Sequence, residues 1–155
     1  MQRLLHEGAA HGGLSSFQRE TIERVMHLGQ VRLGSVMVPR GRAALVPEDI
    51  SRDDFLRIAR MAHFSRYPVY RGDPRQVIGV VEVFDVITDG QRRAVARQVR
   101  PPLTLRADQR VPAALRSLQR EPRAMAIIVD RRGQCVGLLT MKDLVEEIVG
   151  DLAAW

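Results

Sequence analysis

The sequence contains one seven-residue phrase twice, as Gly79-Val80-Val81-Glu82-Val83-Phe84-Asp85 and as Gly137-Leu138-Leu139-Thr140-Met141-Lys142-Asp143. Each copy follows a Pro-bearing segment, an amphipathic helical pattern and a β-rich run that ends near a turn. A phrase that recurs together with its upstream context indicates an internal duplication. We therefore expect the chain to contain one structural unit twice.

Length and composition indicate a compact protein with a hydrophobic core. The chain has 155 residues, of which 45% are hydrophobic, which suits one domain built from two halves. Because Cys135 is the single cysteine, the chain cannot form an intrachain disulfide. Cys135 lies in a predicted strand, and we expect it to be a buried core residue. The longest apolar run, 124–129, is far shorter than the ~20 residues of a membrane-spanning helix, and we expect a soluble chain.

The net charge of +6 raises the question of a nucleic-acid partner. Lys142 is the only lysine among 24 cationic side chains, and the arginines are spread from Arg3 to Arg132 with acidic residues between them. Aromatic residues make up 5% of the chain, which leaves few rings to stack on bases. The charge therefore does not form a binding stripe, and we expect no nucleic-acid partner.

Periodicity and capping signals divide the chain into three blocks. Residues 1–30 form a linker in which Ser15 and Gln18 make a capping box at the start of a helix. Residues 31–92 and 93–155 are the two repeats, and each has the order β-α-β-β-α. Two such units pack by their sheets about a pseudo-twofold axis, with clefts where they meet. The predicted fold class is therefore α/β of the α+β type, preceded by a helix.

The predicted elements of the two repeats correspond to one another. Those of the first repeat are a strand at 43–46, a helix after Ser51, strands at 67–70 and 77–81, and a short helix that includes Val83. Those of the second are a strand at 103–105, a helix that includes Val111, strands at 125–129 and 135–139, and a helix at 141–149.

Thr140 and Asp143 stand where the last predicted strand meets the last helix. A nucleotide site needs a carboxylate for the ribose hydroxyls, a hydroxyl or backbone donor near the phosphates, and positive potential. Thr140 and Asp143 meet the first two demands from one turn. The same Thr-x-x-Asp spacing is also a helix-capping box, worth ~1 kcal/mol without any ligand. The motif alone leaves both interpretations open.

The first repeat has Glu82 at the position of Thr140, while Asp85 keeps the position of Asp143. A carboxylate at residue 82 would repel phosphate and compete for the N-terminus of the helix. We therefore expect one principal nucleotide site in each chain, built around Thr140 and Asp143.

Four phrases resemble a known family. They are VMVPR at 36–40, HFSRYPVY at 63–70, MAIIVD at 125–130 and GLLTMKDLVEEIVG at 137–150. Together they resemble the tandem cystathionine-β-synthase (CBS) pair, or Bateman module, of the CorC/CNNM magnesium and cobalt transport proteins, also called hemolysin-C-like. The lead-in helix is similar to the segment that joins the membrane domain of these proteins to their CBS pair.

The resemblance implies a cytoplasmic regulatory module that binds an adenosine nucleotide (ATP, ADP or AMP), often ATP with Mg²⁺ held by the phosphates. It also implies a homodimer formed through the CBS helices, whose rearrangement controls an attached divalent-cation transport domain that this sequence lacks. The sequence has no Ser/His/Asp set and no Walker-type loop, so we expect no enzyme, and its scattered histidines predict no protein-only metal site. A ligand-free structural dimerisation module is the alternative.

The resemblance assigns further nucleotide contacts to six side chains: Ser65, Arg66, Tyr67, Pro68, Ile127 and Ile128. Arg66 could clamp phosphate, with a solvated surface charge as the alternative. Tyr67 or Pro68 could stack on adenine. The two isoleucines are expected to alternate between core and adenine pocket, and a core role for both stays open. Arg40 is a further phosphate candidate.

Overall fold

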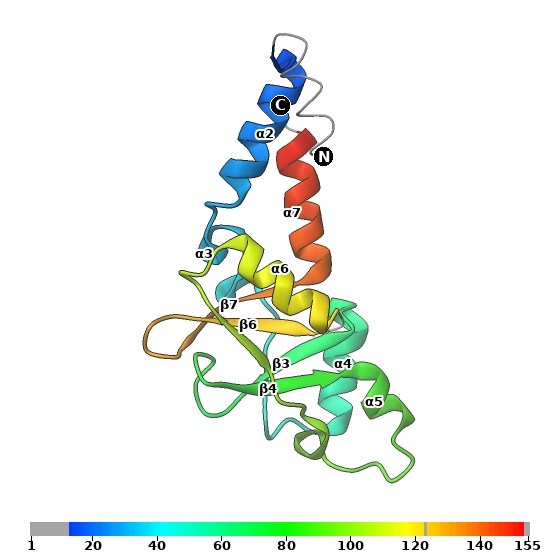
Figure 1. Ribbon diagram of the computed structural model, residues 1–155. Coiled ribbons are helices and arrows are strands. Elements are labelled where there is room, and N and C mark those ends of the chain that lie inside the picture. The colour runs from blue at the N-terminus through cyan, green and yellow to red at the C-terminus, as the bar shows by residue number, and fades with distance from the viewer. Residues whose placement is uncertain (1–12, 123, 154–155) are drawn as a thin grey trace.

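The computed structural model describes residues 13–122 and 124–153, which form two sheets with helices on their outer faces (Figure 1). One sheet has the order β2-β3-β4, with strands at Val46–Pro47, Arg66–Tyr70 and Val77–Glu82. The other has the order β1-β7-β6-β5, with β1 at Val38–Pro39, β5 at Leu103–Arg106, β6 at Met125–Val129 and β7 at Cys135–Thr140. The predicted α+β class and the repeated β-α-β-β-α order are confirmed.

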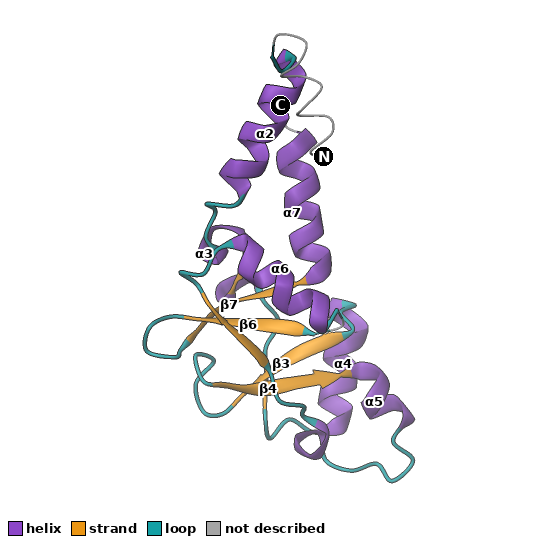
Figure 2. Cartoon of the chain, viewed as in Figure 1, coloured by secondary structure: helices purple, strands orange, loops and turns teal. Residues whose placement is uncertain are grey.

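Helices lie between the strands in the predicted order (Figure 2). The lead-in helix α2 spans Ser16–Leu28, and the helices of the repeats are α4 at Arg52–Ala62, α5 at Val83–Thr88, α6 at Val111–Arg120 and α7 at Met141–Ala153. Four short elements have no counterpart in the prediction: strand β1, helix α3 at Leu33–Val36, and the 3-10 turns η1 at Arg40–Arg42 and η2 at Val95–Gln98.

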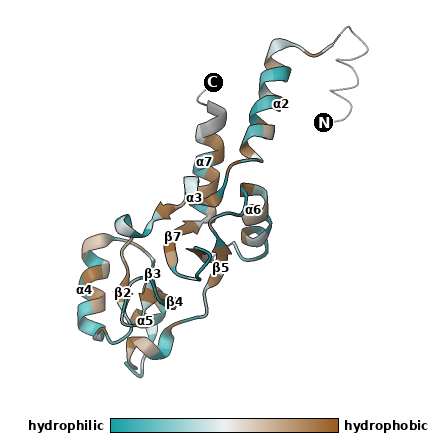
Figure 3. Ribbon diagram, turned by 90° about the vertical axis from the view of Figure 1, so that its left-hand side faces the viewer, coloured by the Kyte–Doolittle hydropathy of each residue, from teal (hydrophilic) through white to brown (hydrophobic). Residues whose placement is uncertain are grey.

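Three buried clusters hold the elements together. One, around Phe55 and Val81, joins the first sheet to its helices, and a second, around Leu118 and Leu139, does the same for the second sheet. The third cluster comprises Val80, Ile127, Cys135 and Leu138, which come from strands of both sheets. The sheets therefore face one another with the helices outside, and Figure 3 shows strand β7 in the hydrophobic colour.

Each sheet also pairs with a backbone segment that lies outside the hairpin formed by its two long strands. Strand β1 pairs antiparallel with β7, with Pro39 opposite Gly137, and Val80 of β4 makes an isolated bridge to Arg100. A Cβ atom at Gly137 would lie 2.7 Å from the carbonyl oxygen of Val38, and one at Gly79 would collide with the carbonyl oxygen of Arg100. The repeated phrase therefore begins with glycine because another backbone passes too close for a side chain.

Helix α2 begins at the predicted capping box. The Ser15 hydroxyl accepts the N–H of Gln18 at 3.1 Å, and the Gln18 side chain accepts the N–H of Ser15 at 2.9 Å. Helix α2 contacts α7, and the two project side by side from the body in Figure 1.

No helix of the described ranges is long and apolar enough to cross a membrane. The predicted division at residues 30/31 and 92/93 stays a prediction, and residues 1–12, 123 and 154–155 of these blocks lie outside the described residues.

The strand predicted at 43–46 is corrected to Val46–Pro47. Residues Arg40–Arg42 form a 3-10 turn, and the N–H of Ala43 bonds to the carbonyl of Arg40 at 3.1 Å. The backbone of this segment is thus engaged in the turn, so pairing with β3 starts only at Val46, which lies opposite Val69.

Candidate functional site

A cleft of about 330 Å³ opens beside the junction of β7 and α7, and we call it the Thr140 cleft. Both repeats contribute to it. Its lining residues are Val38, Arg42, Ala43, Ala44, His63, Phe64, Ser65, Arg66, Pro68, Met125, Leu138, Thr140, Lys142 and Asp143. Five residues predicted for the nucleotide site lie together here: Ser65, Arg66, Pro68, Thr140 and Asp143.

Thr140 and Asp143 form a reciprocal cap at the edge of this cleft. Thr140 ends β7 and Asp143 lies in the first turn of α7. The backbone N–H of Thr140 donates to Asp143 Oδ2 at 3.1 Å, and the N–H of Asp143 donates to Thr140 Oγ1 at 3.2 Å. No donor in the described chain bonds Asp143 Oδ1. The turn is therefore held by its own hydrogen bonds while one carboxylate oxygen stays free for a ligand hydroxyl.

The Thr140 cleft has more basic than acidic side chains. Arg42, His63, Arg66 and Lys142 line it, against the single acid Asp143. Lys142 reaches Glu146 at 3.9 Å, but the two side chains are 84% and 65% exposed, so this ion pair is solvated and weak. Positive potential next to the N-terminus of α7 suits a phosphorylated ligand.

His63 brings the first repeat to the cleft through an unusual backbone conformation. It is the C-cap of α4, with φ 61° in the left-handed region, and its N–H bonds to the carbonyl of Ala59 at 3.0 Å. The helix thus ends abruptly, and the next residues, 64–66, lie along the cleft before β3 continues. His63, Arg42 and Met125 were missed as lining residues, although His63 and Met125 stand in phrases that carried the family resemblance.

Tyr67 is placed in the core, which corrects its predicted stacking role. Its side chain is fully buried, and its ring packs edge-on against Phe55 with centroids 5.5 Å apart. The Tyr67 hydroxyl accepts the N–H of Phe64 at 3.2 Å. Tyr67 therefore supports the segment that lines the cleft, and Pro68 is the predicted stacking residue that lies in the lining.

The structure also places three further candidates outside the cleft. Ile127 lies in the cluster between the two sheets and Ile128 in the cluster under the helices, so the core alternative describes both. The guanidinium of Arg40 donates from Nη1 to the carbonyl oxygen of Cys135 at 2.9 Å, which gives this nitrogen a structural partner. Cys135 itself is buried, and burial raises the pKa of its thiol, as expected for an inert core residue.

A second cleft, of about 450 Å³, is lined by Val80 and Glu82 at the positions equivalent to Leu138 and Thr140, but not by Asp85, and we call it the Glu82 cleft. Its lining residues are Arg66, Val80, Glu82, Arg100, Pro101, Leu103, Glu121, Pro122, Ala124 and Met125. Glu82 makes no side-chain cap to α5. The Asp85 carboxylate pairs with Arg100, with Oδ2 2.8 Å from Nη2 and 3.0 Å from Nε. The carboxylate equivalent to that of Asp143 is thus already engaged.

Comparison with known proteins places the chain in a family. The family model of the CBS domain matches residues 96–150. A solved CBS domain of the bacterial CNNM/CorC family Mg²⁺ transporter, in complex with ATP, is 30% identical, covers 86% of this chain and 97% of its own, and has a TM-score of 0.76. The chain belongs to the CBS domains of the CNNM/CorC family. The predicted resemblance is confirmed.

Curated relatives agree with this assignment. The CNNM/CorC-type CBS chain is 32% identical over 138 residues to the magnesium and cobalt efflux protein CorC of Vibrio cholerae, covering 86% of this chain and 47% of that protein. It is 32% identical over 149 residues to a UPF0053 protein of Mycobacterium tuberculosis, covering 92% of this chain and 34% of that protein. The chain therefore spans about a third to a half of the length of these relatives.

Proposed function

We propose that this CBS module binds an adenosine nucleotide, with ATP as the first candidate, in the Thr140 cleft. The observation that carries the proposal is the Thr140–Asp143 turn, with one free carboxylate oxygen, at the edge of a cleft with a surplus of basic side chains. The related CBS domain solved with ATP supports the choice of ligand.

The chemistry of the lining assigns a role to each part of the nucleotide. Asp143 Oδ1 accepts the ribose hydroxyls, and Pro68 offers an apolar surface to adenine. Arg66, Arg42 and Lys142, with the N-terminus of α7, attract the phosphates. The described residues contain no group of three acidic, His or Cys ligands for a metal. Mg²⁺ would accordingly be carried by phosphate oxygens and water.

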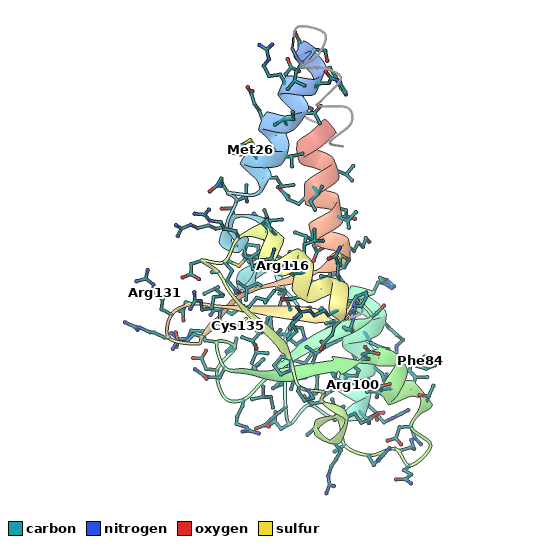
Figure 4. The ribbon with its side chains drawn as sticks, viewed as in Figure 1. Met26, Phe84, Arg100, Arg116, Arg131 and Cys135 are labelled. Atoms are coloured by element: carbon teal, nitrogen blue, oxygen red, sulfur yellow. The ribbon has the colours of Figure 1, made fainter. Side chains whose placement is uncertain are left out.

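A homodimer through the CBS helices is the second part of the proposal. Large apolar side chains are exposed where α4 and α5 meet: Met61 at 77%, Phe64 at 57%, Phe84 at 72% and Ile87 at 58%. Figure 4 shows Phe84 projecting from α5 away from the body. Covering this surface with a second copy would remove its apolar area from water. Phe64 also lines the Thr140 cleft, which links ligand and interface physically.

The regulatory role follows from these two parts. Nucleotide in the Thr140 cleft would bias how two modules pack in the dimer, and thereby control a divalent-cation transport domain in the membrane. The module itself would lie in the cytoplasm and carry no catalytic turnover. Control requires only that the nucleotide bind one packing of the dimer more tightly than another.

Calorimetric titration with ATP, with and without Mg²⁺, tests the binding proposal. We expect saturable binding by the wild-type chain, strengthened by Mg²⁺, and a loss of at least about tenfold in Asp143→Ala, because a charged hydrogen-bond acceptor is removed. Since Asp143 also caps α7, Ser51→Ala is the matched control: it removes the hydroxyl that accepts the N–H of Asp54 at the start of α4, away from the cleft. Ser51→Ala should bind normally.

A ligand-free structural dimerisation module is the competing function, and one observation favours it. The Thr140–Asp143 cap is complete without a ligand, so its residues are explained by helix stability alone. Light scattering of wild type and Phe84→Asp, in the presence and absence of ATP, separates the two. A stable dimer that Phe84→Asp dissociates, in a protein that binds no ATP, ADP or AMP, would establish the structural module instead.

A further inference from the structure

Arg66 holds a position shared by the cavities of both repeats. It lines the Thr140 cleft, the Glu82 cleft and an apolar groove of about 440 Å³ beside Phe64 and Phe84. Its Nη1 atom is buried and has no hydrogen-bond partner in the described chain. An unpaired buried guanidinium nitrogen is costly, so this group has unused capacity for an anion.

Glu82 is the closest cross-strand neighbour of Arg66 in the sheet. The two residues are opposite one another in the antiparallel pair of β3 and β4, so their side chains leave the same face of the sheet. No ion pair joins them within the ranges that the structure describes. Glu82 lines the Glu82 cleft and the apolar groove but not the Thr140 cleft. The guanidinium therefore stands between a carboxylate on one side and the Thr140 cleft on the other.

We propose that Glu82 competes with the phosphates of a bound nucleotide for the guanidinium of Arg66, and so lowers the affinity of the Thr140 cleft. The inference rests on the nucleotide function proposed above. When the Arg66 guanidinium turns toward its cross-strand partner, it pairs with Glu82. When it turns toward the Thr140 cleft, it pairs with phosphate. One side chain cannot give the same donors to both anions, so each partner weakens the other.

In the second repeat, the equivalent cross-strand pair contains no charged residue. Met125 lies opposite Thr140 in the pair of β6 and β7, and both line the Thr140 cleft. Neither side chain carries a charge, so this pair leaves the cleft unaffected by ion pairing. Charge at residues 66 and 82 thus distinguishes the first repeat, and the remaining charges of the Glu82 cleft are Arg100, which pairs with Asp85, and Glu121.

A double-mutant cycle in ATP titrations tests the competition. We expect Glu82→Gln to raise ATP affinity about threefold, the effect that a cross-strand ion pair supports. Arg66→Met, which copies the residue of the second repeat, should lower affinity, and adding Glu82→Gln to it should change nothing further. Glu121→Gln is the matched control, because it removes a carboxylate from the same cleft without a place opposite Arg66.

The outcomes separate this inference from the proposed function. Unchanged or weaker ATP binding in Glu82→Gln, when the wild type binds ATP, would overturn the competition and leave the nucleotide function standing. An equal gain in Glu121→Gln, or a gain that persists in Arg66→Met, would reduce the effect to the general field of the cleft and also overturn it. A folded wild type that binds no nucleotide would overturn both proposals.

Discussion

The two repeats end equivalent strands in the same phrase but differ in chemistry at its end. Strand β7 ends at Thr140, which exchanges hydrogen bonds with Asp143 and caps α7. Strand β4 ends at Glu82, which caps nothing, and Asp85 pairs with Arg100 instead. One end presents a free carboxylate oxygen to a basic cleft, and the other presents acidic groups beside an ion pair.

The comparison separates what the fold requires from what a ligand requires. Both phrases keep glycine at their start, Gly79 and Gly137, because another backbone crosses each one. The residue that precedes the helix differs between the phrases: it is Thr140 in the second and Glu82 in the first. Both repeats thus keep the close backbone packing at the start of the phrase, while only the second has the Thr140–Asp143 cap at its end. Substitutions at equivalent positions test this difference.

Replacing the crossing glycines should have the largest effect. We expect Gly79→Ala and Gly137→Ala to lower the free energy of unfolding by about 2–3 kcal/mol each, because their Cβ atoms collide with backbone. Gly79→Ala should cost more, since Arg100 and Val99 both crowd it, whereas the flexible Met37 absorbs part of the collision at Gly137. Urea denaturation measures both. Gly41→Ala, where a Cβ would meet nothing within 4 Å, is the control, and equal stability of Gly41→Ala and Gly79→Ala would contradict the crossing.

Removing the hydroxyl at the end of β7 should have the next largest effect. Thr140→Val keeps a β-branched side chain but loses the acceptor for the Asp143 N–H, so we expect a loss of about 1 kcal/mol. Glu82→Val, the equivalent change in the first repeat, removes no cap and should stay within about 0.5 kcal/mol of wild type. Thermal unfolding compares the two variants. Equal losses would show that the two helix starts do not differ in capping.

Introducing the missing hydroxyl should have a smaller effect of opposite sign. Glu82→Thr gives α5 a side-chain acceptor for the Asp85 N–H, and we expect a gain of about 0.5 kcal/mol. The gain is only half of a capping box because Arg100 holds the Asp85 carboxylate. The stability gained by Glu82→Thr should be larger when the substitution is made in Arg100→Ala than when it is made in the wild type. Thermal unfolding of the two single variants and the double variant measures this difference. A full gain in Glu82→Thr alone would contradict the hold of Arg100 on Asp85.

The smallest effect is expected where the repeats differ without consequence. Val77 occupies in β4 the position of Cys135 in β7, since each pairs with the last residue of the adjacent strand. Cys135→Val should therefore change stability at pH 7 by less than about 0.5 kcal/mol.

The same substitution should alter the response to alkaline pH. Burial raises the pKa of the Cys135 thiol, so the unfolded chain ionises first and stability is lost as pH rises above the ordinary thiol pKa of about 8.5. Cys135→Val should remove this part of the loss between pH 7 and 9.5 in denaturant unfolding. Identical pH profiles of the two proteins would contradict a buried thiol.

Much of the fold could be predicted because its signals are local. The capping residues Ser15, Ser51 and Thr140 precede helices that begin within one residue of them. Strand β6 has the predicted bounds, Met125–Val129, because its apolar run stops at a turn. The pairing of β1 with β7 had no such signal, since residues 38 and 138 are far apart in the chain. The residue pattern of a strand also does not indicate which other strand it pairs with.

The candidate site could be predicted only in part, because the strands that border it are buried on both faces. Tyr67, Pro68 and Val69 are all buried, so alternation along β3 does not tell which side chain faces the cleft. Ile127 and Ile128 present the same ambiguity on β6. Ion pairing is also hidden from sequence patterns, and the partner of Asp85 lies 15 residues away, at Arg100. The local hydrogen bonds of the turns could therefore be predicted. Which side chains point into the cleft depends on tertiary packing and could not.

The most direct test of unequal clefts is the stoichiometry of ATP binding by calorimetry, in wild type and Asp85→Ala. If only the Thr140 cleft takes nucleotide, as proposed, we expect one ATP for each chain, and the same stoichiometry and affinity in Asp85→Ala. Two ATP molecules for each chain, with one lost in Asp85→Ala, would show that the first repeat also holds a nucleotide site and contradict the difference between the repeats.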